Sequence, residues 1–250
     1  MARKNSPVDS RSSGRRRFLL VVDSDVRKLS QTATLLQRFQ YNIWTAHSAA
    51  EALEMASVAV PALIVTAQFL DDLSGLELIK QLQQIGRLRT VPIVVLTQKT
   101  ASANERDCLF AGALTCLSMP IQLEDLYRVV QVAVEPLPRM NLRINTNLSV
   151  IVNDRNVECV EGECASVLSE HGLYVRLPDP YPLNTRLPVQ IRLADRTIAA
   201  DTVVIYSHQA GDDPQDEPGM GLQFTEISRE DQKRIRLFIR HEITKDIDAR

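Results

Sequence analysis

The stretch Phe18-Leu-Leu-Val-Val-Asp-Ser24 places five consecutive apolar residues directly before an acid and a serine. An apolar run of this kind predicts a β-strand that is covered on both faces, as in a parallel sheet with helices on each side. Similar runs alternate with segments of helical periodicity and span residues 41–45, 62–66, 91–96 and 114–118. We therefore expect an α/β domain over residues 18–134, with a doubly wound five-stranded parallel sheet.

The pattern changes at Glu135-Pro-Leu-Pro138, because two prolines in three residues prevent a helix from continuing. We interpret residues 135–138 as a linker and residues 139–250 as a second domain. Apolar residues then alternate with period two, in segments spanning 142–152, 157–169, 172–177, 185–193, 197–207 and 221–224, before a helix that follows Ser228. Short antiparallel strands with one terminal helix predict a mainly β domain, a small closed barrel.

Composition narrows the class of protein. The 250 residues are 44% hydrophobic and 24% charged, with a net charge of −2, which is close to the average for globular proteins. These values exclude a wholly disordered chain, a collagen-like repeat and a disulfide-stapled miniprotein. No apolar run is long enough for a transmembrane helix. The near-zero net charge argues against nucleic-acid binding.

The first 17 residues differ from the remainder, because they carry a net charge of +5. They lack large apolar side chains, so we expect a disordered basic tail over residues 1–17. The run Arg15-Arg16-Arg17 resembles a twin-arginine export signal, but the apolar segment that follows is too short for one. We expect a cytoplasmic protein, in which the cysteines are small apolar fillers; these are Cys108, Cys116, Cys159 and Cys164.

Residues 18–134 resemble the receiver domain of bacterial response regulators. The resemblance rests on the order and spacing of several stretches, which are Leu20-Val-Val-Asp-Ser24, Ala46-His-Ser-Ala-Ala-Glu-Ala-Leu53, Leu73-Ser-Gly-Leu-Glu-Leu78, Pro92-Ile-Val-Val-Leu-Thr97 and Gly112-Ala113 before Met119-Pro120. The resemblance implies magnesium-assisted phosphoryl transfer to an aspartate at the end of the third strand. It also implies a lysine after the fifth strand and a hydroxyl after the fourth.

This sequence lacks most of that chemistry. The acceptor position holds Ala67, and a methyl group cannot accept a phosphoryl group. The lysine position holds Met119, and the acidic pair is reduced to Asp23, although Thr97 is present. We therefore predict a pseudo-receiver that binds no metal ion and takes no phosphate. The surrogate acceptors that we weighed against this prediction are Asp25, Asp71 and Asp72.

A receiver without phosphorylation is still a scaffold. In ordinary receivers the last helix and the elements before it form a dimerising or partner-binding face. Here the last predicted helix is crowded with apolar residues, and any surplus beyond the core could serve an interface; they are Leu123, Leu126, Val129, Val130, Val132 and Val134. We expect an unidentified protein partner or a homodimer. The sequence contains no pattern typical of catalysis, so we do not expect an enzyme.

Residues 139–250 resemble a PilZ domain, a six-stranded antiparallel barrel with a C-terminal helix that commonly binds cyclic di-GMP. The segment Arg139-Met-Asn-Leu-Arg143 fits the family's Arg-x-x-x-Arg, and Val167-Leu-Ser-Glu-His-Gly172 lies where Asp/Asn-x-Ser-x-x-Gly is expected. Gly219-Met-Gly-Leu-Gln-Phe224 matches the last strand. The resemblance implies cyclic di-GMP as the ligand and Arg139, Arg143, Ser169 and Gly172 as its contacts.

The ligand suits these residue types, because an arginine fork bonds bidentately to guanine or phosphate and its plane stacks on a base. Val167 replaces the expected Asp or Asn and offers no acceptor, which costs about 1–3 kcal/mol of binding free energy. His171 is a possible substitute. Ligand closure on Arg139 and Arg143 would reorder residues 135–143 and shift the two domains.

Two hypotheses follow from the sequence. The first is a cyclic di-GMP effector in which the barrel binds the nucleotide and the pseudo-receiver dimerises or docks. The alternative is an adaptor in bacterial signalling that needs no ligand and acts through protein contacts alone. The Arg139/Arg143 pair favours the first hypothesis, whereas Val167 favours the second.

Overall fold

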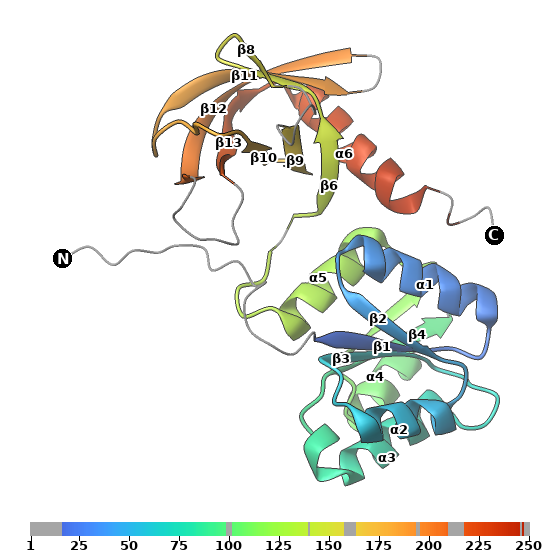
Figure 1. Ribbon diagram of the computed structural model, residues 1–250. Coiled ribbons are helices and arrows are strands. Elements are labelled where there is room, and N and C mark those ends of the chain that lie inside the picture. Colours follow the sequence, from blue (N-terminus) through green and yellow to red (C-terminus); the bar gives the residue numbers. More distant parts are fainter. Residues whose placement is uncertain are drawn as a thin grey trace. The chain divides into compact units, whose positions relative to one another are not determined.

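The computed structural model describes residues 17–98, 102–139, 141–157, 164–193, 196–209, 218–245 and 247 (Figure 1). The chain divides into two compact units, with the change between residues 140 and 141. That position lies beyond the predicted linker 135–138, because the Arg139 amide donates to Gln131 Oε1 at 2.9 Å and keeps the intervening residues with the preceding helix. Of the predicted tail, residues 1–16 lie outside the described part.

The first unit contains the predicted five-stranded parallel sheet. Its strands are β1 (Phe18–Val22), β2 (Asn42–Ala46), β3 (Leu63–Ala67), β4 (Ile93–Gln98) and β5 (Thr115–Met119), in the order β2-β1-β3-β4-β5. All residues of β1 and β3 are buried, as their continuous apolar runs predict. The order is that of doubly wound folds of the flavodoxin type.

Helices cover both faces of this sheet (Figure 1). The helices α1 (Val26–Arg38) and α5 (Leu123–Val134) lie on one face, and α2 (Ala49–Val58), α3 (Gly75–Gln84) and α4 (Ser102–Ala111) on the other, with a short 3-10 turn at Gly86–Leu88. On the first face Phe39 meets Tyr127 edge-on, with ring centroids 5.1 Å apart. On the second face Leu78, Ile79 and Leu82 of α3 are fully buried in the core.

The apolar residues of α5 are mostly buried within the first unit. Leu123, Leu126 and Val130 are buried, and of the six apolar residues predicted to crowd this helix only Val132 is exposed, at 59%. Three exposed apolar residues lie at the end of α4 and before β5: Phe110 is 90% exposed, and Leu109 and Leu114 are each nearly half exposed. Cys108 is buried in the core that includes Leu78 and Leu82, and Cys116 is packed against that core.

The second unit is one antiparallel sheet with eight described strands and a terminal helix. The strands are β6 (Arg143–Leu148), β7 (Val150–Val152), β8 (Arg155–Val157), β9 (Cys164–Ser169), β10 (Gly172–Arg176), β11 (Arg186–Leu193), β12 (Arg196–His208) and β13 (Gly219–Ile227). Their order is β6-β9-β10-β13-β12-β11-β7-β8. The fold is that expected of a PilZ domain.

The sheet curls because β6 and β7 are successive pieces of one extended segment. They are separated by Ser149 alone, yet β6 pairs with β9 whereas β7 pairs with β11. The Ser149 carbonyl accepts the Arg192 amide at 3.2 Å, so pairing with β11 begins at the point of division. One extended segment therefore joins both ends of the sheet, which leaves an apolar interior that includes Ile144, Leu168 and Met220.

The strand count is larger than the six predicted, for an identifiable reason. The predicted strand 142–152 divides at Ser149, and the predicted strand 157–169 corresponds to β8 and β9, with residues 158–163 between them outside the described part. The helix α6 (Arg229–Thr244) then buries Ile235, Ile239 and Ile243. None of the described helices has the length and apolar character that crossing a membrane requires.

Two glycines give a test of the packing in the first unit. A Cβ on Gly75 would lie 2.4 Å from the Ala67 carbonyl oxygen, whereas a Cβ on Gly86 would meet nothing within 4 Å. Gly75→Ala should therefore lower the free energy of unfolding by about 1–3 kcal/mol, and Gly86→Ala should change it by less than about 0.5 kcal/mol. Urea titration followed by the fluorescence of Trp44, the only tryptophan, measures both. Equal stabilities of the two variants would contradict the prediction.

Candidate functional site

Four residues predicted from the receiver resemblance lie at the carboxyl edge of the parallel sheet. Asp23 follows β1, Ala67 ends β3, Thr97 lies near the end of β4, and Met119 ends β5. The strand register places them at a similar level on neighbouring strands. Ligands of open α/β sheets bind at this edge, so the four residues lie together where the strand pattern predicts them.

The acid at this edge is largely withdrawn from solvent. Asp23 is 7% exposed, and its Oδ1 accepts the Asp25 amide at 2.9 Å. Burial raises the pKa of Asp23, and the upward effect exceeds the lowering by that hydrogen bond and by the charge of Lys28. At a given pH, a larger fraction of Asp23 is therefore protonated than of an ordinary aspartate.

The neighbouring acids serve as helix caps. Asp25 Oδ1 accepts the Arg27 and Lys28 amides at the start of α1, and hydrogen bonds from Lys28 lower the pKa of Asp25. The two Asp72 carboxylate oxygens accept amides at the start of α2, at 3.0 and 2.9 Å. Desolvation acts upward on the pKa of Asp72, but these hydrogen bonds together lower it. Such caps stabilise the helix starts.

The other polar groups at this edge are also engaged with the protein. Ser24 Oγ accepts the Asp71 amide at 3.0 Å. Thr97 is 5% exposed, and its hydroxyl lies 3.5 Å from the Leu117 carbonyl oxygen, to which it donates. The edge therefore offers one buried carboxyl group and two bonded hydroxyls, with the Ala67 methyl group between them.

The barrel brings together three of the four residues predicted to contact cyclic di-GMP. Arg143 of β6 is opposite Ser169 of β9, and Ser169 is opposite Gly172 of β10. Residues directly opposite each other in antiparallel strands project from the same face. Adjacent Ile144 and Leu168 are buried inside the barrel, so Arg143 and Ser169 lie on its outer face. Arg139 is exposed and belongs to the first unit.

Ser169 and Gly172 also shape the turn between β9 and β10. The Ser169 hydroxyl donates to the Gly172 carbonyl at 3.0 Å and accepts the His171 amide at 3.4 Å. A Cβ on Gly172 would lie 2.1 Å from the Leu222 carbonyl oxygen, so only glycine allows β10 to approach β13 this closely. His171 is exposed in the turn, with Nδ1 3.5 Å from Gln232 Nε2 of α6.

The register also identifies neighbours that the sequence analysis missed. Val167 is opposite Asn145 on one side and opposite Tyr174 on the other. Both neighbours therefore lie on the face of Arg143 and Ser169. Neither belongs to a motif, and only the strand register, which short segments do not specify, could have found them.

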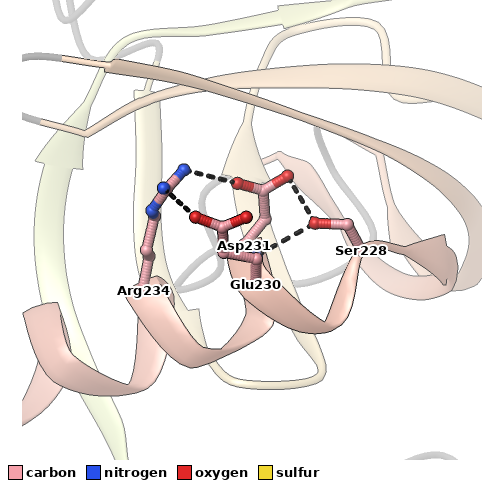
Figure 2. A network of polar contacts seen from close by, with 4 residues as sticks. All are labelled: Ser228, Glu230, Asp231 and Arg234. Atoms are coloured by element: carbon pink, nitrogen blue, oxygen red, sulfur yellow. Dashed lines mark hydrogen bonds and ion pairs between the residues drawn. The ribbon is translucent and has the colours of Figure 1, made fainter.

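An ion pair holds this turn to the terminal helix. Arg236 donates to both oxygens of Glu170, from Nε at 2.8 Å and from Nη2. These hydrogen bonds, from a side chain that also supplies the opposite charge, lower the pKa of Glu170. Figure 2 shows the separate network at the start of α6, where Ser228 Oγ accepts the Asp231 amide at 3.0 Å and Arg234 bonds Asp231 and Glu230.

A groove of about 780 Å³ lies beside the turn. It is lined by residues 188–190 of β11, 199–201 of β12 and 224–227 of β13, and by the start of α6. Its charged side chains include Asp201 and Glu226, which do not suit a dianion. It includes His171 but neither Arg143 nor Ser169. Among the residues described, no three His, Cys, Asp or Glu side chains are grouped so that they could hold a metal ion.

These features define a two-domain protein, with a receiver-type parallel sheet followed by an antiparallel barrel. The family model of the response regulator receiver domain matches residues 19–131, and that of the PilZ domain matches residues 138–241. The chain thus contains a response regulator receiver domain followed by a PilZ domain. This combination supports a signalling protein that binds cyclic di-GMP.

Individual relatives resemble part of the chain. The two-component response regulator ORR5 of Oryza sativa subsp. japonica is 28% identical over 112 residues, which cover 44% of this chain and 84% of that protein. ORR3 of Oryza sativa subsp. indica is 26% identical over 112 residues, with 44% and 86% covered. The chemotaxis response regulator CheY4 of Vibrio cholerae has a solved structure with 24% identity, a TM-score of 0.45, and 48% and 99% covered.

The Glu170–Arg236 pair makes the stability of the turn depend on pH. Because the pKa of Glu170 is lowered on folding, the pair stabilises the fold above the ordinary pKa of 4.5 and is lost as pH falls through the folded value. Arg236→Gln should cost about 0.5–1 kcal/mol at pH 7, since Arg236 is half exposed. The difference from the unsubstituted chain should shrink progressively as pH falls below 4.5. Urea titration by far-UV circular dichroism at pH 7 and at a series of lower pH values measures this.

Arg234→Gln is the matched control, because it removes the same charge from the same helix. Arg234 pairs with Glu230 and Asp231 of α6 itself (Figure 2). Its loss should therefore leave amide hydrogen exchange at residues 169–172 unchanged, whereas Arg236→Gln should accelerate it. Equal acceleration in both variants would mean that the ion pair does not hold the turn.

Proposed function

We propose that this chain is a cytoplasmic cyclic di-GMP effector whose PilZ barrel binds the ligand, and whose receiver domain acts without phosphorylation as a docking or dimerising module. The observation that carries the proposal is the row Arg143–Ser169–Gly172 on the outer face of β6, β9 and β10. The row matches the order in which the PilZ motifs supply ligand contacts. No enzymatic reaction is part of the proposal.

The chemistry of binding is charge-assisted hydrogen bonding by arginine. The Arg143 guanidinium can bond two acceptors of a guanine edge or of a phosphate, and cyclic di-GMP carries two negative charges. Arg139 lies just before the barrel, within the short segment that leads into β6. Its guanidinium adds the second fork. Reordering of residues 135–143 on binding remains our prediction for how the ligand signals to the receiver domain.

The receiver edge supports the second half of the proposal. Magnesium prefers several acidic oxygens, but this edge supplies the buried Asp23 carboxyl with Asp71 near it, while Asp25 and Asp72 are helix caps. Within the described residues, no three acids are grouped so that they could hold a metal ion. These residues do not fit a magnesium ion. Because Ala67 offers no oxygen, we infer that the domain takes no phosphoryl group. Exposed Phe110 and its neighbours Leu109 and Leu114 supply an apolar surface for docking.

One observation favours the alternative, an adaptor that acts without a ligand. The Ser169 hydroxyl donates its proton to the Gly172 carbonyl, so this serine already has a structural partner. With Val167 beside it, two of the positions expected to contact guanine then contribute little. A titration distinguishes the two functions, because an adaptor binds no cyclic di-GMP.

Calorimetric titration of cyclic di-GMP into the full chain tests the proposed function. We expect saturable binding, weakened by at least about tenfold in Arg143→Ala, because a hydrogen bond to a charged group contributes about 1.5–3 kcal/mol. Arg192→Ala is the matched control: Arg192 is an exposed arginine of β11, away from the row, and its loss should leave the affinity unchanged. No heat with the unsubstituted chain would establish the adaptor instead.

Incubation with magnesium and acetyl phosphate, followed by intact mass spectrometry, tests the receiver domain. We expect no phosphoryl adduct on the unsubstituted chain, because its acceptor position is Ala67. The triple variant Ser24→Asp, Ala67→Asp and Met119→Lys restores the missing groups and is the comparison expected to gain an adduct. An adduct on the unsubstituted chain would show that another residue accepts phosphate.

A further inference from the structure

Two tyrosines lie side by side on the outer face of the barrel. Tyr174 of β10 and Tyr206 of β12 are both opposite Gly221 of β13, one from each side. Their rings are nearly parallel, with an interplanar angle of 15° and centroids 5.8 Å apart. Both side chains are half-buried, so part of each ring faces solvent.

Glycines of β13 make room for these rings. A Cβ on Gly221 would lie 2.1 Å from Cε1 of Tyr206, and a Cβ on Gly219 would lie 2.6 Å from the Tyr174 hydroxyl oxygen. Each ring therefore occupies the place where a side chain of β13 would otherwise project. The two aromatic rings rest on bare backbone, which holds them close to the sheet.

The tyrosine pair continues the ligand face described above. A row of opposite residues runs across five strands: Asn145, Val167, Tyr174, Gly221 and Tyr206. The row Arg143–Ser169–Gly172 lies next to it, two residues along each strand. Because neighbouring strands are about 4.8 Å apart, Tyr174 directly adjoins Val167.

The charges on this face suit an anion. Arg143 lies on one side of the tyrosine row, and Arg176, opposite Gly219, lies on the other. The His208 ring meets Tyr206 at a centroid distance of 5.9 Å. Within the described parts of β6, β9, β10 and β13, the positions that share this face from Arg143 to Arg176 hold no acid. Two arginines with aromatic rings between them match two phosphates joined through a nucleoside.

We propose that Tyr174 and Tyr206 form a stacking platform for a purine base of the cyclic dinucleotide, with Arg176 on the phosphate beside it. The proposal rests on the proposed function, since it places the second half of the same ligand. Aromatic side chains stack with any base, because every base has a π-face. Stacking here takes the place of the acceptor that Val167 lacks.

Stacking without that acceptor has a consequence for specificity. Guanine and adenine differ in the hydrogen-bond donors and acceptors along their edges. A valine side chain has neither a donor nor an acceptor, so it does not discriminate between the two bases. The platform therefore holds both purines, and the chain should bind cyclic di-AMP within about tenfold of cyclic di-GMP. Val167→Asp adds an acceptor for guanine and should widen the ratio.

The experiment titrates cyclic di-GMP and cyclic di-AMP into the full chain and into Tyr174→Leu and Tyr206→Leu. Each leucine variant should lose roughly 5- to 150-fold in affinity for both ligands. Tyr174→Phe and Tyr206→Phe keep the ring and should remain within about threefold. Tyr181→Leu, in the loop after β10, is the matched control and should bind normally. Thermal unfolding checks that each variant is folded.

The outcomes separate the platform from the proposed function. Loss of affinity in Arg143→Ala together with unchanged affinity in both leucine variants would overturn the platform alone. Loss in the phenylalanine variants equal to that in the leucine variants would also overturn it, because hydroxyl contacts would then be responsible. Absence of binding of either nucleotide by the unsubstituted chain would overturn both proposals. If a leucine variant fails to fold, Gly221→Ala, whose Cβ displaces the Tyr206 ring, must lose affinity in its place.

Discussion

The barrel depends on one extended segment that pairs with both ends of the sheet. Because β6 pairs with β9 and β7 pairs with β11, with only Ser149 between them, the closure fixes the register of the first strand. A shift of one residue would turn Arg143 inward and Ile144 outward. Burial of Ile144 therefore holds Arg143 on the outer face, opposite Ser169, and the ligand face follows from the packing of the core.

The sequence predicted the positions of the strands better than it predicted which strands pair with one another. The alternation of short, largely apolar segments with helical ones located the five parallel strands within two residues. The signal is strongest for β1 and β3, whose residues are all apolar or buried. The motifs located Arg143, Ser169 and Gly172. The neighbours Asn145, Tyr174 and Tyr206 could not be found in this way, because no short segment specifies which strand it pairs with or in which register. An irregularity between Val204 and Tyr206 also displaces Tyr206 from simple alternation.

The fold of the receiver domain does not depend on the residues at its carboxyl edge. Its stability comes from the apolar residues of β1 and β3 and the helices that cover them, and none of these are reacting groups. The acids left at the carboxyl edge have structural uses instead. Asp25 and Asp72 satisfy amides at the starts of α1 and α2, where an acid also interacts favourably with the helix dipole. Acids at this edge are thus compatible with the receiver domain that we propose, which takes no phosphoryl group.

The same reasoning decides which motif residues carry information about function. Gly75 and Gly172 are required by close backbone approaches, to Ala67 and Leu222 respectively, and Ser169 bonds its own turn. Their presence is therefore explained by the folds alone. For Arg143, the pairing of β6 with β9 fixes the face on which the side chain lies and not the residue type. A guanidinium on that face, with a second arginine and two aromatic rings, suits the anionic ligand that we propose.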